Sequence, residues 1–347
     1  MPPRSGDPLP LFDDLPAAPA RRGGERPDGP VGTATRPLVL PARLEPYRSQ
    51  LRLGTSSWSF PGWQGLVWDT PAVPYAQGRL SRDGLPAYAA HPLLSAVGID
   101  RGFYAPIGVD TYAHHAAQVP AGFRFLVKAP AQVTDALRRD EHGRGREPNP
   151  QFLDAAAAIG QFVAPAAEGL RTTLGTLLFQ FSPLPPSMLA DPPAWIASLH
   201  RFLEALPRAL PSGAGIAVEL RDPSLLTPRL IDALRDAGVA YCLGLHDRMP
   251  PVARQLRALA RLHPDGPGPL VARWTLHPGI GYEAARHRYA PFDTLLDPDP
   301  DSRLPLAEAC AVALRAGQTV TVIANNKAEG SAPLTLTLLA EAIAAAL

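Results

Sequence analysis

The segment Leu51-Arg52-Leu53-Gly54-Thr55-Ser56-Ser57-Trp58 opens a regular alternation of short apolar runs and helix-like patterns that continues to residue 347. Each run is four to seven residues long, which is typical of a buried parallel strand. The predicted strands are residues 51–55, 94–99, 123–128, 176–180, 216–219, 240–245, 270–274 and 319–325.

Helix start and stop signals lie between these strands. Asp110 can cap a helix, Thr227-Pro228 opens one that Gly238 ends, and Gly317 ends another. We expect helices over 110–119, 228–237, 304–316 and 334–347. Eight strands alternating with helices indicate an α/β protein, either a closed (β/α)8 TIM-type barrel or a doubly wound sheet. No Gly-x-Gly-x-x-Gly follows the first strand, which favours the single barrel.

Residues 1–48 are rich in Pro, Gly, Arg and Ala without a sustained period. This composition predicts a disordered tail, followed by one barrel domain over 49–347. The tail contains Leu9-Pro10-Leu11-Phe12-Asp13-Asp14-Leu15. This stretch either has no binding role beyond docking on its own domain, or resembles the Leu-x-Leu-Phe peptides that bind bacterial sliding clamps. Pro8 stands where those peptides have glutamine.

The overall composition limits the classes of partner and compartment. Apolar residues make up 46% of the chain, which suffices for a core without metals or disulfides. The net charge of +1 gives no global field that would attract a nucleic acid or a membrane surface. Cys242 and Cys310 lie in apolar runs, as expected of buried reduced thiols. We expect a cytoplasmic protein, since no transmembrane helix or secretory signal is evident.

Polar residues collect where the predicted strands end. In a barrel, the carboxyl ends of all strands converge on one mouth, where the active sites of such folds are built. Because the middle of each strand is mostly apolar, the polar strand ends predict one site, formed by Ser56, Trp58, Tyr104, Lys128, Gln180, Glu219, Arg221, His246, Arg273, Asn325 and Asn326.

Three of these residues are candidate catalytic groups. Lys128 is either a snorkelling or salt-bridged lysine, or a site cation that can hold an anion or, if desolvated, act as a base. Glu219 and Arg221 are two apart and face the same side of a strand, so they form either an ordering ion pair or a carboxylate base tuned by a guanidinium. His246 is the third candidate, although its neighbour Asp247 is not expected to form the orienting bond of a triad by itself.

The other candidates would bind substrate. Arg221 and Arg273 would hold an anion, while the amides of Gln180, Asn325 and Asn326 cannot titrate and would orient the ligand. Ser56 and Tyr104 complete the predicted substrate-binding set. Trp58 is either a stacking platform or ordinary packing.

No organic cofactor is evident in the sequence. A divalent metal is a weaker alternative, because Glu219, Asp222, His246 and Asp247 are ligand types found at the strand ends of such barrels. No His-x-His or His-Glu-x-x-His motif supports this metal site.

Several motifs occur in a fixed order along the chain. They are Gly54-Thr55-Ser56-Ser57-Trp58-Ser59-Phe60-Pro61-Gly62-Trp63-Gln64-Gly65, then Phe103-Tyr104, then the segments 123–130, 177–180, 217–223 and 325–333. Together they resemble the YecE-like family, the domain of unknown function 72, over about residues 51–347. The resemblance implies a TIM-type barrel and no established activity.

The chain departs from that family pattern at two places. Where the family commonly has Val-Glu-Ile-Asn, this chain has Val97-Gly98-Ile99-Asp100, which puts an acid/base or metal role at Gly98 in doubt. Where the family often has Arg-x-His-Gly, this chain has the longer Arg273-Trp274-Thr275-Leu276-His277-Pro278-Gly279.

The sequence favours an enzyme acting on a small anionic or sugar-like substrate by acid/base chemistry, of hydrolase or isomerase-like type. The alternative is a non-catalytic barrel that binds nucleic acid or a protein. The aromatic loop 58–68 and the arginine-rich loop 138–146 are the features that favour this alternative.

Overall fold

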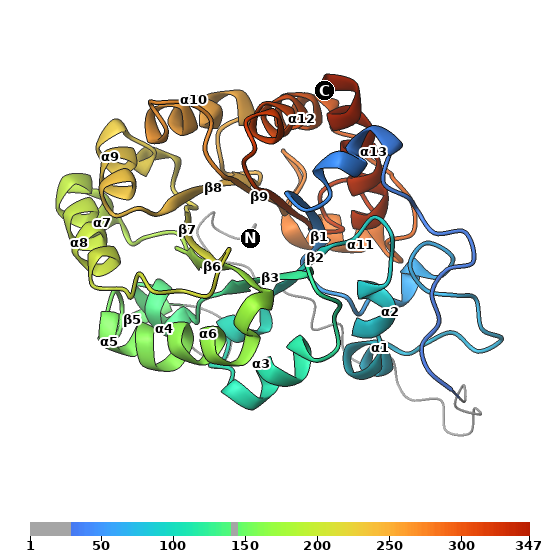
Figure 1. The fold of residues 1–347 in the computed structure, drawn as a ribbon. Helices are drawn as coiled ribbons and strands as arrows, with labels where there is room; N and C mark the ends of the chain where they lie inside the picture. The colour runs from blue at the N-terminus through green and yellow to red at the C-terminus, as the bar shows by residue number, and fades with distance from the viewer. Residues whose placement is uncertain (1–28, 140–144) are drawn as a thin grey trace, which may run out of the picture.

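Eight parallel strands close into a barrel in the computed structural model, which describes residues 29–139 and 145–347 (Figure 1). The order around the barrel is β1-β10-β9-β8-β7-β6-β3-β2. Each of the eight barrel strands coincides with a predicted run to within two residues, which confirms the TIM-type barrel. The strands are β1 Leu51–Thr55, β2 Ala96–Ile99, β3 Arg124–Lys128, β6 Leu174–Gln180, β7 Gly215–Glu219, β8 Ala240–Leu245, β9 Leu270–Trp274 and β10 Val320–Ala324.

Helices cover the outside of this barrel (Figure 1). The α-helices are α1 Gln77–Asp83, α2 Leu85–Ala89, α3 Val109–Ala116, α4 Ala131–Thr134, α5 Ala155–Ala158, α6 Ala164–Leu170, α7 Pro186–Leu189, α8 Pro192–Glu204, α9 Pro228–Asp236, α10 Val252–Leu262, α11 Tyr282–Tyr289, α12 Pro300–Arg315 and α13 Ala332–Ala346. Short helical turns are η1 Ala42–Tyr47, η2 Pro61–Trp63, η3 Arg101–Phe103, η4 Ile159–Val163, η5 Arg171–Thr173 and η6 Pro223–Leu225.

One predicted cap is present and one is wrong. Helix α3 begins at Val109 after Gly108 without a side-chain cap, so Asp110 lies inside its first turn instead of capping it. The Thr227 side chain accepts a hydrogen bond from the Leu230 amide and begins α9 as expected. Helix α12 begins at Pro300, four residues before the predicted start. The Asp299 side chain caps it by accepting from the Ser302 amide, a signal that the apolar pattern alone does not reveal.

The inside of the barrel is filled by an apolar layer, which fixes the direction of the side chains above it. This layer consists of Ala96, Leu126, Leu178, Ala217, Cys242, Val271 and Ile323. Residues two apart on a strand face the same side. The residues two positions further along, toward the carboxyl ends, therefore also point inward: Gly98, Lys128, Gln180, Glu219, Gly244, Arg273 and Asn325.

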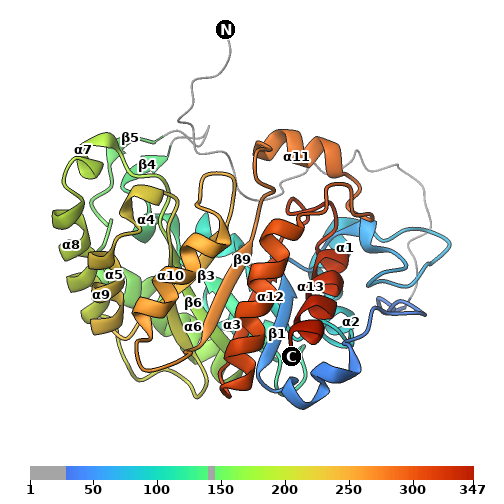
Figure 2. The same cartoon turned by 90° about the horizontal axis from the view of Figure 1, so that it is seen from above.

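Additional elements gather at the carboxyl ends of the strands. Figure 2 shows α7, α11 and a two-stranded hairpin at one end of the barrel. The hairpin pairs β4 Leu137–Arg139 with β5 Gly145–Pro148 in antiparallel fashion. It forms the two flanks of the arginine-rich loop predicted over 138–146, and residues 140–144 of that loop lie outside the described part of the chain.

The packed part of the chain begins earlier than the predicted boundary at residue 49. Val31, Leu40 and Leu44 are buried in the main core, and the Ala34 amide donates to the Val67 carbonyl. These contacts come from isolated apolar residues and a short turn, so they leave no periodic pattern in the sequence. Residues 1–28, including the clamp-like stretch from Leu9 to Phe12, lie outside the described residues.

Two expectations from composition can be compared with the described residues. No helix within 29–139 or 145–347 is long and apolar enough to cross a membrane. Cys242 and Cys310 are buried free thiols, as predicted.

Candidate functional site

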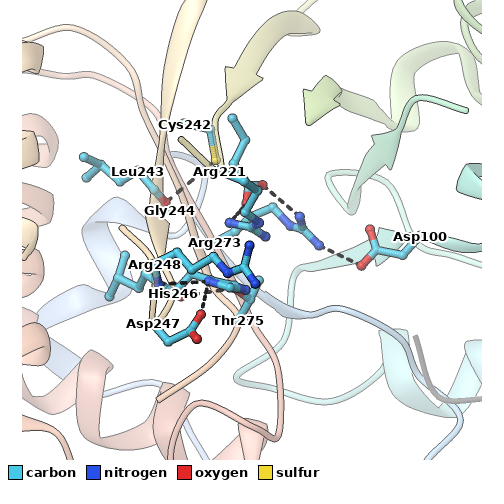
Figure 3. A network of polar contacts seen from close by, with 12 residues as sticks. Asp100, Arg221, Cys242, Leu243, Gly244, His246, Asp247, Arg248, Arg273 and Thr275 are labelled. Carbon is cyan, nitrogen blue, oxygen red and sulfur yellow. Dashed lines mark hydrogen bonds and ion pairs between the residues drawn. The ribbon is translucent and has the colours of Figure 1, made fainter. Parts of the chain in front are cut away.

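A row of alternating buried charges crosses the barrel mouth (Figure 3). Arg273 on β9 donates from Nη2 to Asp100 Oδ2 at 2.7 Å and from Nη1 to Glu219 Oε2 at 2.8 Å. On the other side of Glu219, Arg221 Nη1 lies 2.5 Å from Oε1. All four side chains are buried. We call Asp100, Arg273, Glu219 and Arg221 the charge row.

Asp100 is a member of the charge row that the predicted site residues did not include. It follows β2 and lies two positions beyond Gly98, so it continues the inward-facing positions of that strand. Asp100 is the polar residue where the second predicted strand ends, which is the same signal that identified Lys128 and Gln180.

The two carboxylates of the charge row differ in their protonation. Burial raises the pKa of Asp100, and Arg273 only partly opposes this effect. Burial also acts to raise the pKa of Glu219, but Arg221 and Arg273 outweigh it and hold that pKa below its usual range. Glu219 therefore stays ionised near neutral pH. A carboxylate bound between two guanidinium groups is better suited to positioning them than to accepting a proton.

Lys128 lies inside the barrel at the end of β3 and is fully buried. Its Nζ lies 3.6 Å from the centre of the Phe103 ring, and Tyr104 packs edge-on against that ring at the exposed rim. Burial lowers the pKa of Lys128 to about 7, with Asp100 opposing the effect and Arg273 adding to it. The amine can therefore gain or lose a proton near neutral pH.

Gln180 is the inward side chain between Lys128 and Glu219 around the barrel. Its strand β6 pairs with both β3 and β7, and Gln180 is the register partner of Glu219. The side chain is fully buried. Among the described residues, neither its amide oxygen nor its amide nitrogen has a hydrogen-bond partner.

His246 follows β8, where the chain turns back on itself. Its Nδ1 contacts the Asp247 carboxylate and also accepts a hydrogen bond of 3.3 Å from the Arg248 amide. The Met249 amide donates to the His246 carbonyl in the same turn. Burial and Arg221 lower the pKa of His246, and Asp247 only partly offsets them.

Comparisons with known proteins define the family. The family described as "Protein of unknown function DUF72" matches residues 52–347. The chain belongs to the DUF72 family. A DUF72 protein from Enterococcus faecalis V583 has a TM-score of 0.53 and 18% identity, covering 84% of this chain and 96% of that one. A DUF72 protein from Thermotoga maritima MSB8 has a TM-score of 0.55 and 18% identity, covering 84% and 98%.

At these identities the two solved structures show that the DUF72 members share the barrel fold, and no more than the fold. A comparison with curated proteins gives no match.

Gly98 lies at a crowded point of the barrel mouth in this DUF72 chain. A Cβ on Gly98 would lie 3.2 Å from the Ser56 Cα and carbonyl oxygen. Ser56 itself accepts a hydrogen bond of 2.7 Å from Asn325 Nδ2. Gly98 thus allows β2 to approach the end of β1, where Ser56 and Asn325 join the mouth.

Two predicted substrate-binding residues of the DUF72 chain contact neighbouring parts of the fold. Asn326 Oδ1 accepts from the Trp63 indole at 3.1 Å and from the Ala332 amide at 2.8 Å, so it joins the loop after β1 to the start of α13. Trp58 packs edge-on against His115 of α3, with 5.3 Å between ring centres. This contact corresponds to the packing alternative for Trp58.

The four candidate metal ligands do not form a cluster in the DUF72 barrel. Glu219 belongs to the charge row, Asp222 accepts from the Leu184 amide, and His246 contacts Asp247. Over the described ranges, no three His, Cys, Asp or Glu side chains are grouped in a way that could hold a metal ion.

Proposed function

We propose that this DUF72 barrel is an enzyme that transfers protons to and from a small anionic or sugar-like substrate at the carboxyl ends of its strands. The observation that carries the proposal is Lys128, a fully buried amine whose pKa of about 7 lets it exchange a proton at neutral pH. A general base works best when its pKa lies near the working pH.

The charge row supplies the electrostatic part of this mechanism. Arg221 and Arg273 are fixed by Glu219 and Asp100, so their positive charges are oriented before a substrate arrives. Fixed charges of this kind stabilise negative charge that develops on a carbonyl or leaving-group oxygen. Glu219, predicted as a catalytic base, is assigned the positioning of both guanidinium groups in this proposal.

His246 provides a second proton carrier. It lies at the end of β8 beside Asp247 and close enough to Arg221 to have its pKa lowered by it. Transfer of a proton from the carbon beside a carbonyl group to Lys128 Nζ, and from the resulting ammonium group back to the substrate, would be isomerase-like chemistry, with His246 exchanging a proton with the carbonyl oxygen. Activation of a water molecule by the same amine would be hydrolase-like chemistry.

The test is a substrate screen in D2O followed by NMR. The purified protein is incubated with sugar acids, hydroxy acids and sugar phosphates, and both deuterium incorporation and new products are recorded. We expect at least one compound to exchange or react with the wild type, and Lys128→Met to abolish the reaction. A matched control is Gln118→Met, which changes a half-buried side chain after α3, outside the proposed site. Turnover that survives in Lys128→Met would exclude the proposed role of this amine.

A further inference from the structure

Two buried side chains at the mouth offer hydrogen-bonding groups that no described residue uses. Arg221 contacts Glu219 through Nη1, while its Nε and Nη2 have no hydrogen-bond partner among the described residues. The same is true of both amide atoms of Gln180. Buried polar groups are nearly always hydrogen-bonded, and an unsatisfied one costs about 1–3 kcal/mol. Two such side chains at the barrel mouth point to a ligand.

Both side chains lie at the barrel mouth, on either side of Glu219. Gln180 lies two positions beyond the inner-layer residue Leu178 and is the register partner of Glu219 on the next strand. Gly244 occupies the corresponding inward position on β8, where a Cβ would lie 3.4 Å from Arg221 Nη1 and 3.7 Å from Glu219 Cγ. The absence of a side chain at Gly244 therefore leaves room for the guanidinium within the barrel.

From these groups we infer that the mouth binds a hydroxycarboxylate of the sugar-acid type, with Arg221 holding the carboxylate and Gln180 a neighbouring hydroxyl. This inference rests on the proposed function and names the substrate class for that site. The Nε and Nη2 donors form one edge of a planar guanidinium, and that edge matches the two oxygens of a carboxylate. The Gln180 amide has one donor group and one acceptor, which a hydroxyl group complements in both directions.

The balance of charge favours a monoanion. The charge row contains two carboxylates and two guanidinium groups, so its formal charge is zero when all four are ionised. Lys128 then contributes at most one further positive charge. A carboxylate balances that charge, whereas a phosphate ester dianion would leave a buried negative charge in excess, and such charges are costly.

The rim provides an apolar face for the carbon skeleton of such a ligand. Phe103 is buried beside Lys128, and Tyr104 packs against it with 52% of its surface exposed. Aromatic rings at the edge of a site commonly pack against the C–H face of a sugar while its hydroxyl groups bond to polar side chains.

Isothermal titration with four probes tests the inference: D-gluconate, D-glucose, acetate and D-glucose 6-phosphate. We expect gluconate to bind most tightly, because it alone has both a carboxylate and hydroxyl groups. Gln180→Met, nearly isosteric, should weaken gluconate about tenfold and leave acetate unchanged, since a hydrogen bond contributes roughly 0.5–1.5 kcal/mol. Arg221→Lys should weaken both carboxylates, because lysine lacks the two-donor edge.

Gln118→Met serves as the matched control and should bind gluconate like the wild type. If Arg221→Lys does not fold, Gln180→Met still decides the outcome. This variant removes polar groups that have no hydrogen-bond partner among the described residues and leaves the buried charges unchanged, so we expect it to fold. Glucose or glucose 6-phosphate binding as tightly as gluconate would overturn the inference. So would an unchanged gluconate affinity in Gln180→Met. Gluconate binding without turnover of any compound would contradict the proposed function alone, while turnover of a sugar phosphate without gluconate binding would contradict the inference alone.

Discussion

Replacing Lys128 with methionine should stabilise the protein at acidic pH and flatten the pH dependence of its stability. Burial holds the pKa of Lys128 at about 7, whereas a lysine in an unfolded chain has a pKa of about 10.4. Between these values the unfolded chain binds more protons than the fold, so the free energy of unfolding of the wild type rises with pH across this window. Below pH 7 the buried amine is protonated, so the cost of burying the ammonium group lowers the free energy of unfolding in full.

The size of the effect follows from the same two pKa values. Their difference corresponds to about 4–5 kcal/mol, or about 1.4 kcal/mol for each pH unit in the window. The ammonium also contacts the Phe103 ring, a contact worth roughly 0.5–2 kcal/mol that a methionine sulfur partly replaces. Lys128→Met should therefore exceed the wild type by about 2–4 kcal/mol at pH 6 and lose this advantage toward pH 10.

Urea unfolding of both proteins at pH 6, 7, 8 and 9 measures this difference directly. The pKa itself is accessible by NMR, because the chain contains two lysines, Lys128 and Lys327. Protein labelled with ¹³C at lysine Cε should give two signals, and the one lost in Lys128→Met should titrate near pH 7. Parallel stability curves for the two proteins, or a Lys128 signal that titrates near pH 10, would refute the reasoning.

Three further substitutions test other parts of the structure. Asp100→Asn removes a buried partner of Arg273 and should lower the free energy of unfolding by about 3 kcal/mol; an unchanged urea midpoint would contradict the ion pair. Asn326→Ala should cost about 2–4 kcal/mol through the lost bonds to Trp63 and the Ala332 amide, with unchanged gluconate affinity by titration. Leu44→Ala should lower the free energy of unfolding, measured by thermal unfolding, by about 2–4 kcal/mol. An unchanged stability would show that the segment around Leu44 is not packed against the barrel.

The barrel was predictable because each of its strands is a continuous apolar run with a polar residue where it ends. The site was predictable to the extent that strand alternation controls side-chain direction. Lys128, Gln180 and Glu219 each follow an inner-layer residue by two positions, and this spacing alone places them in one mouth. The hydrogen-bond partners were not predictable, because they depend on contacts between strands that are distant in sequence, such as Arg273 with Asp100.

The residues that sequence reasoning placed less well depart from that alternation. Asn326 lies in the turn beyond the end of β10, and its side chain bonds to Trp63. Trp58 lies beyond the end of β1, where strand alternation no longer controls direction, and it packs against α3. The segment around Leu44 is packed through a short turn without a period. Each of these positions is determined by tertiary packing, which a local pattern does not encode.

Lysine is rare in this chain, and the places of its two lysines indicate why an amine lies at the barrel mouth. Of its 33 basic residues two are lysines, and both are fully buried near the carboxyl ends of strands, Lys128 on β3 and Lys327 after β10. Arginine keeps its proton in a protein, whereas a desolvated lysine can release it. Lys327 is bound within the fold, with Nζ 3.3 Å from Asn325 Oδ1 and 4.7 Å from the Tyr282 ring centre. Lys128 instead lies beside the charge row, where an amine can move a proton and a guanidinium cannot.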